Sequence, residues 1–211
     1  MAIEEQTLGA WLDALASEDP APGGGAAAAM CATLAAALVS MVAHFTIGRK
    51  RYADVDAHAR ELLTSSEQTR SMLLQLAEAD AEAYGMVALA YRLPKGTEEE
   101  VERRHNALQG ALTQATEVPV MIAEVARQVV QMANLIAKIG NRTVLTDAGA
   151  ASFMAMAAIS AAGLNVQVNL RELHDEVRGH ALQKRLTAAM DGVGELTNET
   201  LQFIAARMSE K

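Results

Sequence analysis

One carboxylate occupies a position that helical cores usually give to apolar side chains. Asp80 lies on a stripe of helical spacing between Leu76 and Ala83, and Tyr84 stands one turn further along the same face. A carboxylate that faces a core is costly unless it has a partner, and in a cleft its pKa is expected to be raised or tuned. Asp80 is therefore a candidate functional acid. A structural acid paired with a buried Arg or Lys is the alternative.

A run of three glycines opens a long Ala-rich helix. Gly23, Gly24 and Gly25 follow Pro20 and Pro22, and the absence of side chains lets another group approach the backbone closely. The unpaired N–H groups at a helix N-terminus also suit an anion or an electronegative heterocycle. The run predicts a binding site, with close helix–helix packing as the alternative.

Positive charges gather at two corners of an acidic chain. Arg49, Lys50 and Arg51 follow the far end of the Ala-rich helix, and Arg92 and Lys95 follow the helix that carries the core-facing acid. The net charge of −8 argues against nucleic-acid binding. Two basic corners on such a chain favour a ligand that bears carboxylates, with solvated helix ends as the alternative.

A polar connection between two later helices supplies a second candidate carboxylate. Asn141 and Thr146 lie in this connection, and Asp147 falls in the first turn of the next helix. Asp147 either complements the helix dipole or joins the site. Asn165 and Asn169, one turn apart, are interpreted as hydrogen-bonded core amides. No histidine pair has metal-ligand spacing, so no metal site is expected.

Helical spacing of apolar residues predicts an all-α fold of about seven helices, because no segment alternates with the period of a strand. The composition agrees, since only 3% of the residues are aromatic and small helix formers dominate. The expected helices cover residues 8–15, 25–46, 54–91, 101–115, 118–139, 148–163 and 182–204, with a break before Pro119.

Two of these segments, 25–43 and 148–163, are rich in Ala and Gly on every face, so they are predicted to lie at the centre of a single domain, 1–211. The first is about as long as a membrane span, yet Ala and Gly insert weakly, so no membrane association is expected. The single Cys31 and the acidic N-terminus favour a reducing cytoplasm. The outer Leu and Met stripes favour a homodimer.

Seven motifs, taken together, resemble the cyclodeaminase/cyclohydrolase family of folate enzymes over about residues 5–205. That family comprises the cyclodeaminase part of formiminotransferase-cyclodeaminase and the stand-alone methenyltetrahydrofolate cyclohydrolases. The motifs are Pro20-Ala21-Pro22-Gly23-Gly24-Gly25, Thr46-Ile47-Gly48-Arg49-Lys50-Arg51-Tyr52, Asp80-Ala81-Glu82-Ala83-Tyr84, Tyr91-Arg92-Leu93-Pro94-Lys95, Gly140-Asn141, Thr146-Asp147-Ala148-Gly149 and Leu164-Asn165-Val166-Gln167-Val168-Asn169-Leu170.

The resemblance implies an all-helical homodimer that acts on a one-carbon adduct of tetrahydrofolate without a metal, a nucleotide or any cofactor beyond the folate itself. It implies that Asp80 is the general acid/base, that Lys50 is a nearby proton donor or sets the pKa of that acid, and that Asp147 is the reserve carboxylate. Water would add to the methenyl carbon in one family reaction, and ammonia would leave from a formimino carbon in the other.

The same resemblance assigns substrate contacts. The glycine run would let the flat pterin lie against backbone, and Arg92 and Lys95, or Arg49, would hold the carboxylates of the glutamate tail. Tyr84, Asn141 and Thr146 complete the expected binding residues. Ala26 and Thr143 stand where the family often has Ser and Asn, and these departures bear on the exact substrate.

The favoured activity is that of a methenyltetrahydrofolate cyclohydrolase, which hydrolyses 5,10-methenyltetrahydrofolate to 10-formyltetrahydrofolate. This choice depends on the chain ending soon after the motif region, without a transferase domain. A formimidoyltetrahydrofolate cyclodeaminase is the first alternative, and a non-catalytic helical interaction module is the second.

Overall fold

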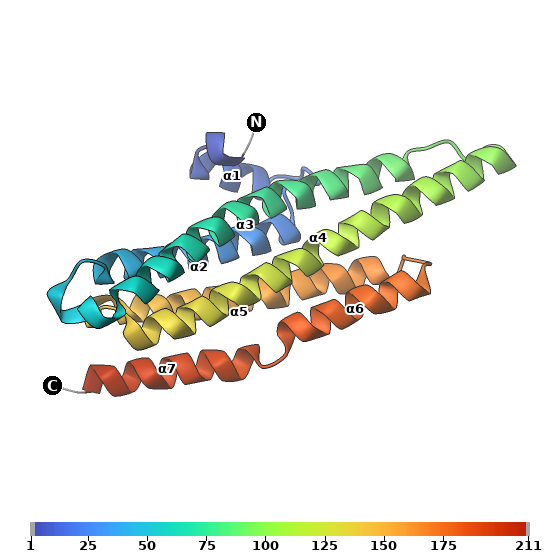
Figure 1. The fold of residues 1–211 in the computed structure, drawn as a ribbon. Helices are drawn as coiled ribbons and strands as arrows, with labels where there is room; N and C mark the ends of the chain where they lie inside the picture. The colour runs from blue at the N-terminus through green and yellow to red at the C-terminus, as the bar shows by residue number, and fades with distance from the viewer. Residues whose placement is uncertain (1–2, 210–211) are drawn as a thin grey trace.

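The computed structural model describes residues 3–209, which form seven α-helices, three short 3₁₀-helices and no strand (Figure 1). The all-α prediction is confirmed. In chain order the elements are η1 (Ile3–Glu5), α1 (Leu8–Leu15), α2 (Gly24–Thr46), η2 (Lys50–Val55), α3 (Asp56–Tyr91), α4 (Glu98–Ile139), η3 (Arg142–Val144), α5 (Leu145–Leu170), α6 (Glu176–Met190) and α7 (Val193–Ser209).

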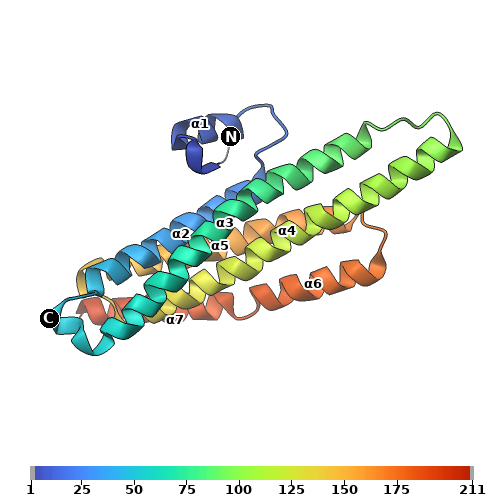
Figure 2. The ribbon, with the colours of Figure 1, turned by 45° about the horizontal axis from the view of Figure 1, so that its top comes forward.

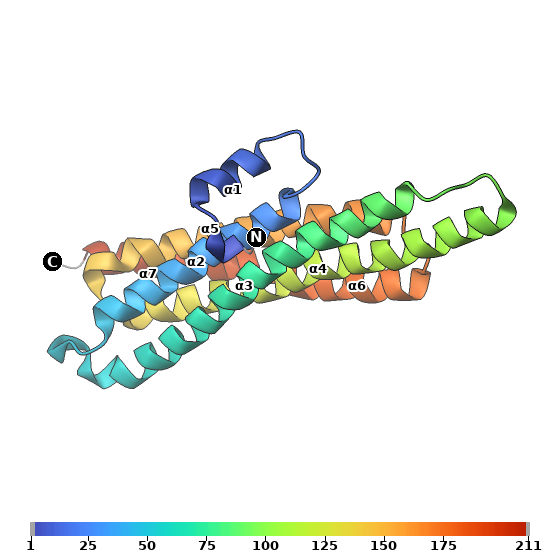
Figure 3. The same cartoon turned by 90° about the horizontal axis from the view of Figure 1, so that it is seen from above.

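Four long helices, α2 to α5, form an elongated antiparallel bundle. α2 packs between α3 and α5, and α4 packs against the same two helices from the other side (Figures 1 and 3). α6 and α7 run end to end along α4 and α5, whereas α1 stands apart from the bundle beside α2 and α3 (Figure 2). The tip of the α3–α4 hairpin projects beyond the other helices.

The core is built on the two helices that lack bulky residues. Most Ala side chains of α2 and α5 are fully buried, and larger side chains such as Leu73 and Ile122 fill the space between the backbones. Each of these helices nevertheless leaves one stripe uncovered, including Leu34 on α2 and Leu164 on α5. The predicted central helices are therefore buried on most of their faces but not on all of them.

The helices differ from the sequence-based expectation in three places. α5 (Leu145–Leu170) extends beyond the expected 148–163 at both ends. The predicted break before Pro119 is wrong, because α4 continues through that residue as one helix of 42 residues. The predicted final helix is instead two helices, α6 and α7, which meet at Gly192 in the left-handed backbone region with a φ of 69°. The connection allows the chain to change direction while both helices stay packed on α4.

Three helical stretches have the length and apolar composition of membrane spans: Gly24–Thr46, Glu98–Ile139 and Arg142–Leu170. Between 50% and 67% of their most apolar windows is buried inside the bundle. Burial accounts for much of their hydropathy, and the absence of membrane association stays a prediction.

Candidate active site

A cavity of about 260 Å³ lies where the glycine run enters α2. Asp80 and Tyr84 of α3 line one side, and Asn165 and Asn169 of α5 line another. The segment from Pro20 to Gly25 closes the cavity, which Ala115 of α4 also borders. The fold therefore brings together five predicted site residues, Gly23, Gly24, Gly25, Asp80 and Tyr84.

Asp80 supplies the helix cap that the glycine run cannot. Gly23 is the N-cap of α2 and has no side chain to accept from the first-turn N–H groups. The Asp80 carboxylate accepts the backbone N–H of Ala26 instead. Burial raises the pKa of the Asp80 carboxyl above its ordinary value, and the Ala26 N–H opposes that shift only in part. The Asp80 carboxyl therefore holds its proton to a higher pH than an exposed Asp does.

Gly25 is required by the position of this carboxylate. A Cβ atom placed on Gly25 would lie 2.5 Å from Cγ and 2.6 Å from Oδ2 of Asp80, and closer still to Oδ1. Such distances are far inside ordinary contact, so only glycine admits the acid here. A ligand was expected to approach the glycine backbone closely, whereas at Gly25 the approaching group is a side chain of the protein.

Two amides on the opposite wall face the same cavity. Asn165 lies against Gly24, and its Nδ2 donates to the Ala161 carbonyl at 3.0 Å. Asn169 Nδ2 donates to the Ala115 carbonyl at 2.7 Å. Both amides are hydrogen-bonded as predicted, but they line the cavity rather than the core. Asn165 and Asn169 are one helical turn apart in the sequence, so they lie on the same face of α5. This spacing is the sequence feature that could have placed both residues in the site.

A second cluster of predicted residues lies at the other end of α2. Asn141 anchors this end, because its Nδ2 donates to the Phe45 carbonyl at 2.9 Å and its Oδ1 accepts from Thr143 N–H at 3.1 Å. Tyr52 Oη donates to the same Oδ1 at 3.4 Å and accepts from Arg142 N–H at 3.1 Å. Asn141 therefore ties together η2, η3 and the end of α2.

The helix lengths separate this cluster from the Asp80 cavity. Gly24 and Thr46 are the two ends of α2, which places them roughly 33 Å apart at 1.5 Å per residue. Lys50 lies beyond that end in η2, and Thr146 and Asp147 lie in the first turn of α5 beside it. Within one chain the expected proximity of Lys50 to Asp80 is wrong.

Arg49, Arg92 and Lys95 also lie outside the cavity. Arg49 is the residue before η2, and Arg92 is the C-cap of α3, about 18 Å along that helix from Asp80. Lys95 follows in the exposed α3–α4 connection. The predicted carboxylate-binding residues therefore occupy both ends of the molecule, while the acid lies between them.

Comparison with known proteins places this arrangement in a family. The family model for formiminotransferase-cyclodeaminase matches residues 7–188. This protein belongs to that family. The resemblance inferred from the seven motifs is confirmed.

Relatives of two kinds are similar to the chain. A methenyltetrahydrofolate cyclohydrolase of Methylorubrum extorquens is 39% identical over 97% of this chain and 98% of its own length. A formimidoyltransferase-cyclodeaminase of Rattus norvegicus is 34% identical over 90% of this chain, which corresponds to 35% of that longer protein. A solved formiminotetrahydrofolate cyclodeaminase of Thermotoga maritima has a TM-score of 0.87 at 28% identity, covering 98% of this chain and 99% of its own.

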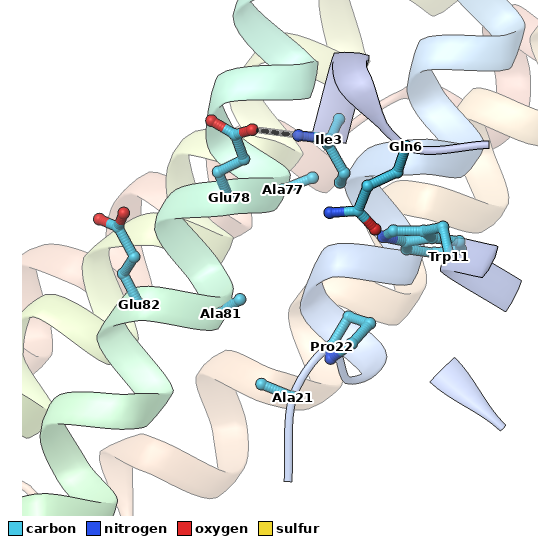
Figure 4. Close-up of a pocket in the computed structure, with 9 residues that line it drawn as sticks. All are labelled: Ile3, Gln6, Trp11, Ala21, Pro22, Ala77, Glu78, Ala81 and Glu82. Atoms are coloured by element: carbon cyan, nitrogen blue, oxygen red, sulfur yellow. Dashed lines mark hydrogen bonds between the residues drawn. The ribbon is translucent and has the colours of Figure 1, made fainter. Parts of the chain in front are cut away.

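A second cavity of about 460 Å³ adjoins the Asp80 cavity across Ala21 and Ala81 (Figure 4). Trp11 of α1 borders it, and Glu78 accepts the Ile3 N–H at 2.5 Å. Figure 4 shows Glu78 and Glu82 on the α3 wall, with Glu82 pointing away from Trp11. The two acids make this side unsuitable for a glutamate tail, which carries the same sign of charge.

Across residues 3–209 no cluster of His, Cys, Asp or Glu has the geometry of a metal site. The chemistry that the geometry itself supports is proton transfer by Asp80 beside polar amides and exposed backbone.

Proposed function

We propose that this protein is a methenyltetrahydrofolate cyclohydrolase, which converts 5,10-methenyltetrahydrofolate and water to 10-formyltetrahydrofolate. The observation that carries the proposal is a partly buried carboxylate of raised pKa at the start of α2, in a chain that matches a relative of that name over nearly the whole length of both. The cavity has the size for the bicyclic head of a folate rather than for the whole molecule.

The reaction needs one group that first accepts and then returns a proton. Water adds to the cationic methenyl carbon between N5 and N10, and ionised Asp80 accepts the proton that the water loses. The neutral adduct then opens as the bond from that carbon to N5 breaks, and Asp80 returns the proton to N5. The hydroxyl of the adduct loses its own proton to solvent as the carbonyl forms, and the carbon stays on N10 as the formyl group. The cation and water therefore give neutral 10-formyltetrahydrofolate and one released proton, and atoms and charge balance.

The environment of Asp80 suits both steps. Burial raises the pKa of the carboxyl toward the working pH, which makes it a better base than an exposed Asp and a competent acid once protonated. The Ala26 N–H fixes the carboxylate in one orientation against the first turn of α2. The delocalised cation of the substrate also favours a site that contains an ionised acid.

The decisive assay follows the loss of 5,10-methenyltetrahydrofolate absorbance against a buffer blank, because the uncatalysed hydrolysis is appreciable. Wild-type protein should accelerate the loss, and Asp80→Asn should lower kcat by about 10²–10⁴-fold, the usual contribution of a general acid/base. Folded Asp80→Asn protein with wild-type turnover would refute the role of Asp80.

A cyclodeaminase is the second candidate. The observation that favours it is the structural similarity to the Thermotoga maritima formiminotetrahydrofolate cyclodeaminase along nearly the entire chain. The same acid would donate a proton to the leaving ammonia as N10 closes on the formimino carbon. Enzyme-dependent ammonia release from 5-formiminotetrahydrofolate, without acceleration of methenyl hydrolysis, would select this function.

We propose further that two copies of the chain pack through the uncovered stripes of α2 and α5. α2 contains no Asp, Glu, Lys or Arg, and α5 contains only Asp147. Leu34 is 49% exposed and Leu164 is 65% exposed, and Phe45 and Phe153 add aromatic surface to the same two helices. Exposed apolar side chains on two helices that pack side by side are typical of a protein interface.

The proposed dimer also reunites the two halves of the site. A two-fold axis that crosses the middle of α2 at right angles would run the two copies of α2 antiparallel, with the start of α2 in one copy against the end of α2 in the other. Gly24 lies at the start and Lys50 lies just beyond the end. Lys50 of one copy would then act beside Asp80 of the other.

Hybrid dimers test this arrangement. Asp80→Asn and Lys50→Ala are each expected to lose activity, and refolding them together should restore about a quarter of the wild-type activity, since random pairing gives one intact site in half of the dimers. Asp80→Asn mixed with Gly25→Ala is the matched control, because both changes damage the same half of the site. No recovery in the first mixture would contradict the shared site.

Three further expectations belong to the same proposal. The balanced reaction uses only folate, water and the side chains of the protein, so no additional cofactor is proposed. The acidic net charge supports a protein that does not bind nucleic acid. A single, partly buried Cys31 supports residence in a reducing cytoplasm.

A further inference from the structure

A proline inside α4 leaves one backbone carbonyl of that helix without its usual partner. Pro119 has no N–H, so it cannot donate to the carbonyl of Ala115 four residues earlier, and its ring also crowds that carbonyl. Ala115 is half-buried, and a backbone carbonyl left unpaired in such a position is costly. The helix remains continuous here, so another donor must compensate.

That donor is a side chain of the candidate active site. Asn169 of α5 donates its Nδ2–H to the Ala115 carbonyl at 2.7 Å, and both residues line the Asp80 cavity. The hydrogen bond decides which way the planar amide faces, because only its nitrogen can pair with a carbonyl. Among residues 3–209 no donor reaches the Asn169 Oδ1, which is left as an acceptor.

We propose that Pro119 positions Asn169 so that the Asp80 cavity presents a hydrogen-bond acceptor that selects the ligand ring by its N–H groups. This inference rests on the proposed folate function and adds Asn169 as the residue that recognises the pteridine ring by a hydrogen bond. The reduced pteridine of a tetrahydrofolate carries N–H groups on the ring and an exocyclic amine, all of them donors. A ring edge that carries only acceptors would leave Oδ1 unpaired, so such a ring would bind more weakly than one that donates an N–H.

The two walls of the cavity supply different functions, proton transfer from one and ligand binding from the other. Asp80 lies on α3, whereas Asn169 lies in the last turn of α5. A ring held by Asn169 is therefore anchored from a different helix than the one that moves the proton. Asn169 is expected to act on substrate binding and selectivity, and Pro119 acts only through Asn169, as a positioning residue.

Pro119→Ala tests this coupling, because it returns an N–H to position 119 that can pair with the Ala115 carbonyl and displace Asn169. Alanine also raises helix propensity, so the melting temperature should equal or exceed that of the wild type. KM for 5,10-methenyltetrahydrofolate should rise about three- to tenfold, the effect of one neutral hydrogen bond. kcat should stay within about twofold, since the proton-transfer group is untouched.

The matched control is Gly110→Ala in the same helix. A Cβ at Gly110 would meet nothing within 4 Å, and the residue lies away from the Ala115 carbonyl. This variant should also gain thermal stability, but KM should not change. A rise in KM in the control equal to that of Pro119→Ala would overturn the proposal, because it would assign the effect to helix stiffness.

Asn169→Leu tests the selecting residue directly. It should raise KM as much as Pro119→Ala does, and the double variant should be no worse than Asn169→Leu alone, because Pro119 has no other route to the ligand. Additive losses would overturn the positioning role of Pro119. Unchanged KM in Asn169→Leu would overturn the selecting role of Asn169.

A measurement without substrate keeps the inference separate from the proposed function and from the folding of any variant. The side-chain amide of Asn169 in the wild type should exchange its hydrogens slowly by NMR, because one N–H is held by the Ala115 carbonyl. Fast exchange would overturn the positioning whatever the enzyme does. Slow exchange in a protein that does not act on folates would instead support the positioning and refute the proposed function.

Discussion

Gly25→Ala changes the position of the Asp80 carboxylate without changing the acid itself. The new Cβ would lie 2.5 Å from the Asp80 Cγ and 2.6 Å from its Oδ2, whereas ordinary contact begins at 3.4 Å. The carboxylate must therefore retreat by about 1 Å, since the α2 and α3 backbones are packed together. That retreat misaligns the acid with the Ala26 N–H and with any bound carbon.

The size of the effect follows from these contacts. Alanine gains about 0.5–1 kcal/mol over glycine within a helix, and losing one hydrogen bond to a charged group costs about 1.5–3 kcal/mol. The free energy of unfolding should thus fall by about 1–2 kcal/mol, which leaves a domain of this size folded. kcat should fall by about 10²–10⁴-fold, because a displaced acid no longer transfers the proton.

The assay is methenyl absorbance loss under saturating substrate, with urea unfolding followed by circular dichroism. Gly24→Ala is the graded comparison: its Cβ would lie 3.5–3.6 Å from the Asn165 amide, an ordinary contact, so most of kcat should remain. Gly194→Ala, where a Cβ meets nothing within 4 Å, controls for the added methyl. A folded Gly25→Ala protein with wild-type kcat would refute the assignment of Asp80.

Two further outcomes depend on the same geometry. Because the folded-state pKa of Asp80 is raised, the native state holds this proton more tightly than the unfolded state, and stability falls as pH rises above the ordinary pKa of about 3.9. Asp80→Asn should therefore be more stable than wild type in urea at pH 7.5, by a margin that shrinks toward pH 4; a constant margin would contradict the burial argument. Leu34→Asp places a charge in the middle of the uncovered α2 stripe and should convert dimers to inactive monomers in light scattering, whereas Leu8→Asp on α1, 59% exposed, should leave the dimer intact. Equal masses for both variants would place the interface elsewhere.

Much of the site could be predicted because it depends on local properties of the chain. A charged residue on an apolar stripe identified Asp80, and the consecutive glycines identified the place where it packs. The register between them follows from helix length. Gly24 lies 22 residues before the end of α2 and Asp80 lies 24 residues after the start of α3, so antiparallel packing brings both to the same level.

The same lengths could have excluded a contact between Lys50 and Asp80 within one chain. Lys50 lies beside the turn that joins α2 to α3, one whole helix length from the acid. Lys50 and Asp80 were expected in one site because both belong to motifs of the family. The order of motifs along a chain, however, gives no information about the distance between them in space. Whether a second copy brings its Lys50 close to Asp80 depends on how the uncovered faces of α2 and α5 pack together. Helical periodicity shows only that such a face is an apolar stripe.

What the sequence by itself determined is the helical class, the lengths of α2 and α3 and therefore the level at which Asp80 meets Gly25. Only the tertiary structure decided that Asn169 of α5 supplies the donor that Pro119 denies to Ala115, and that α4 continues through its proline. The physical reason is that helix period and length are properties of neighbouring residues. The partner of a single carbonyl depends instead on the rotation and spacing of two helices that are distant in the chain.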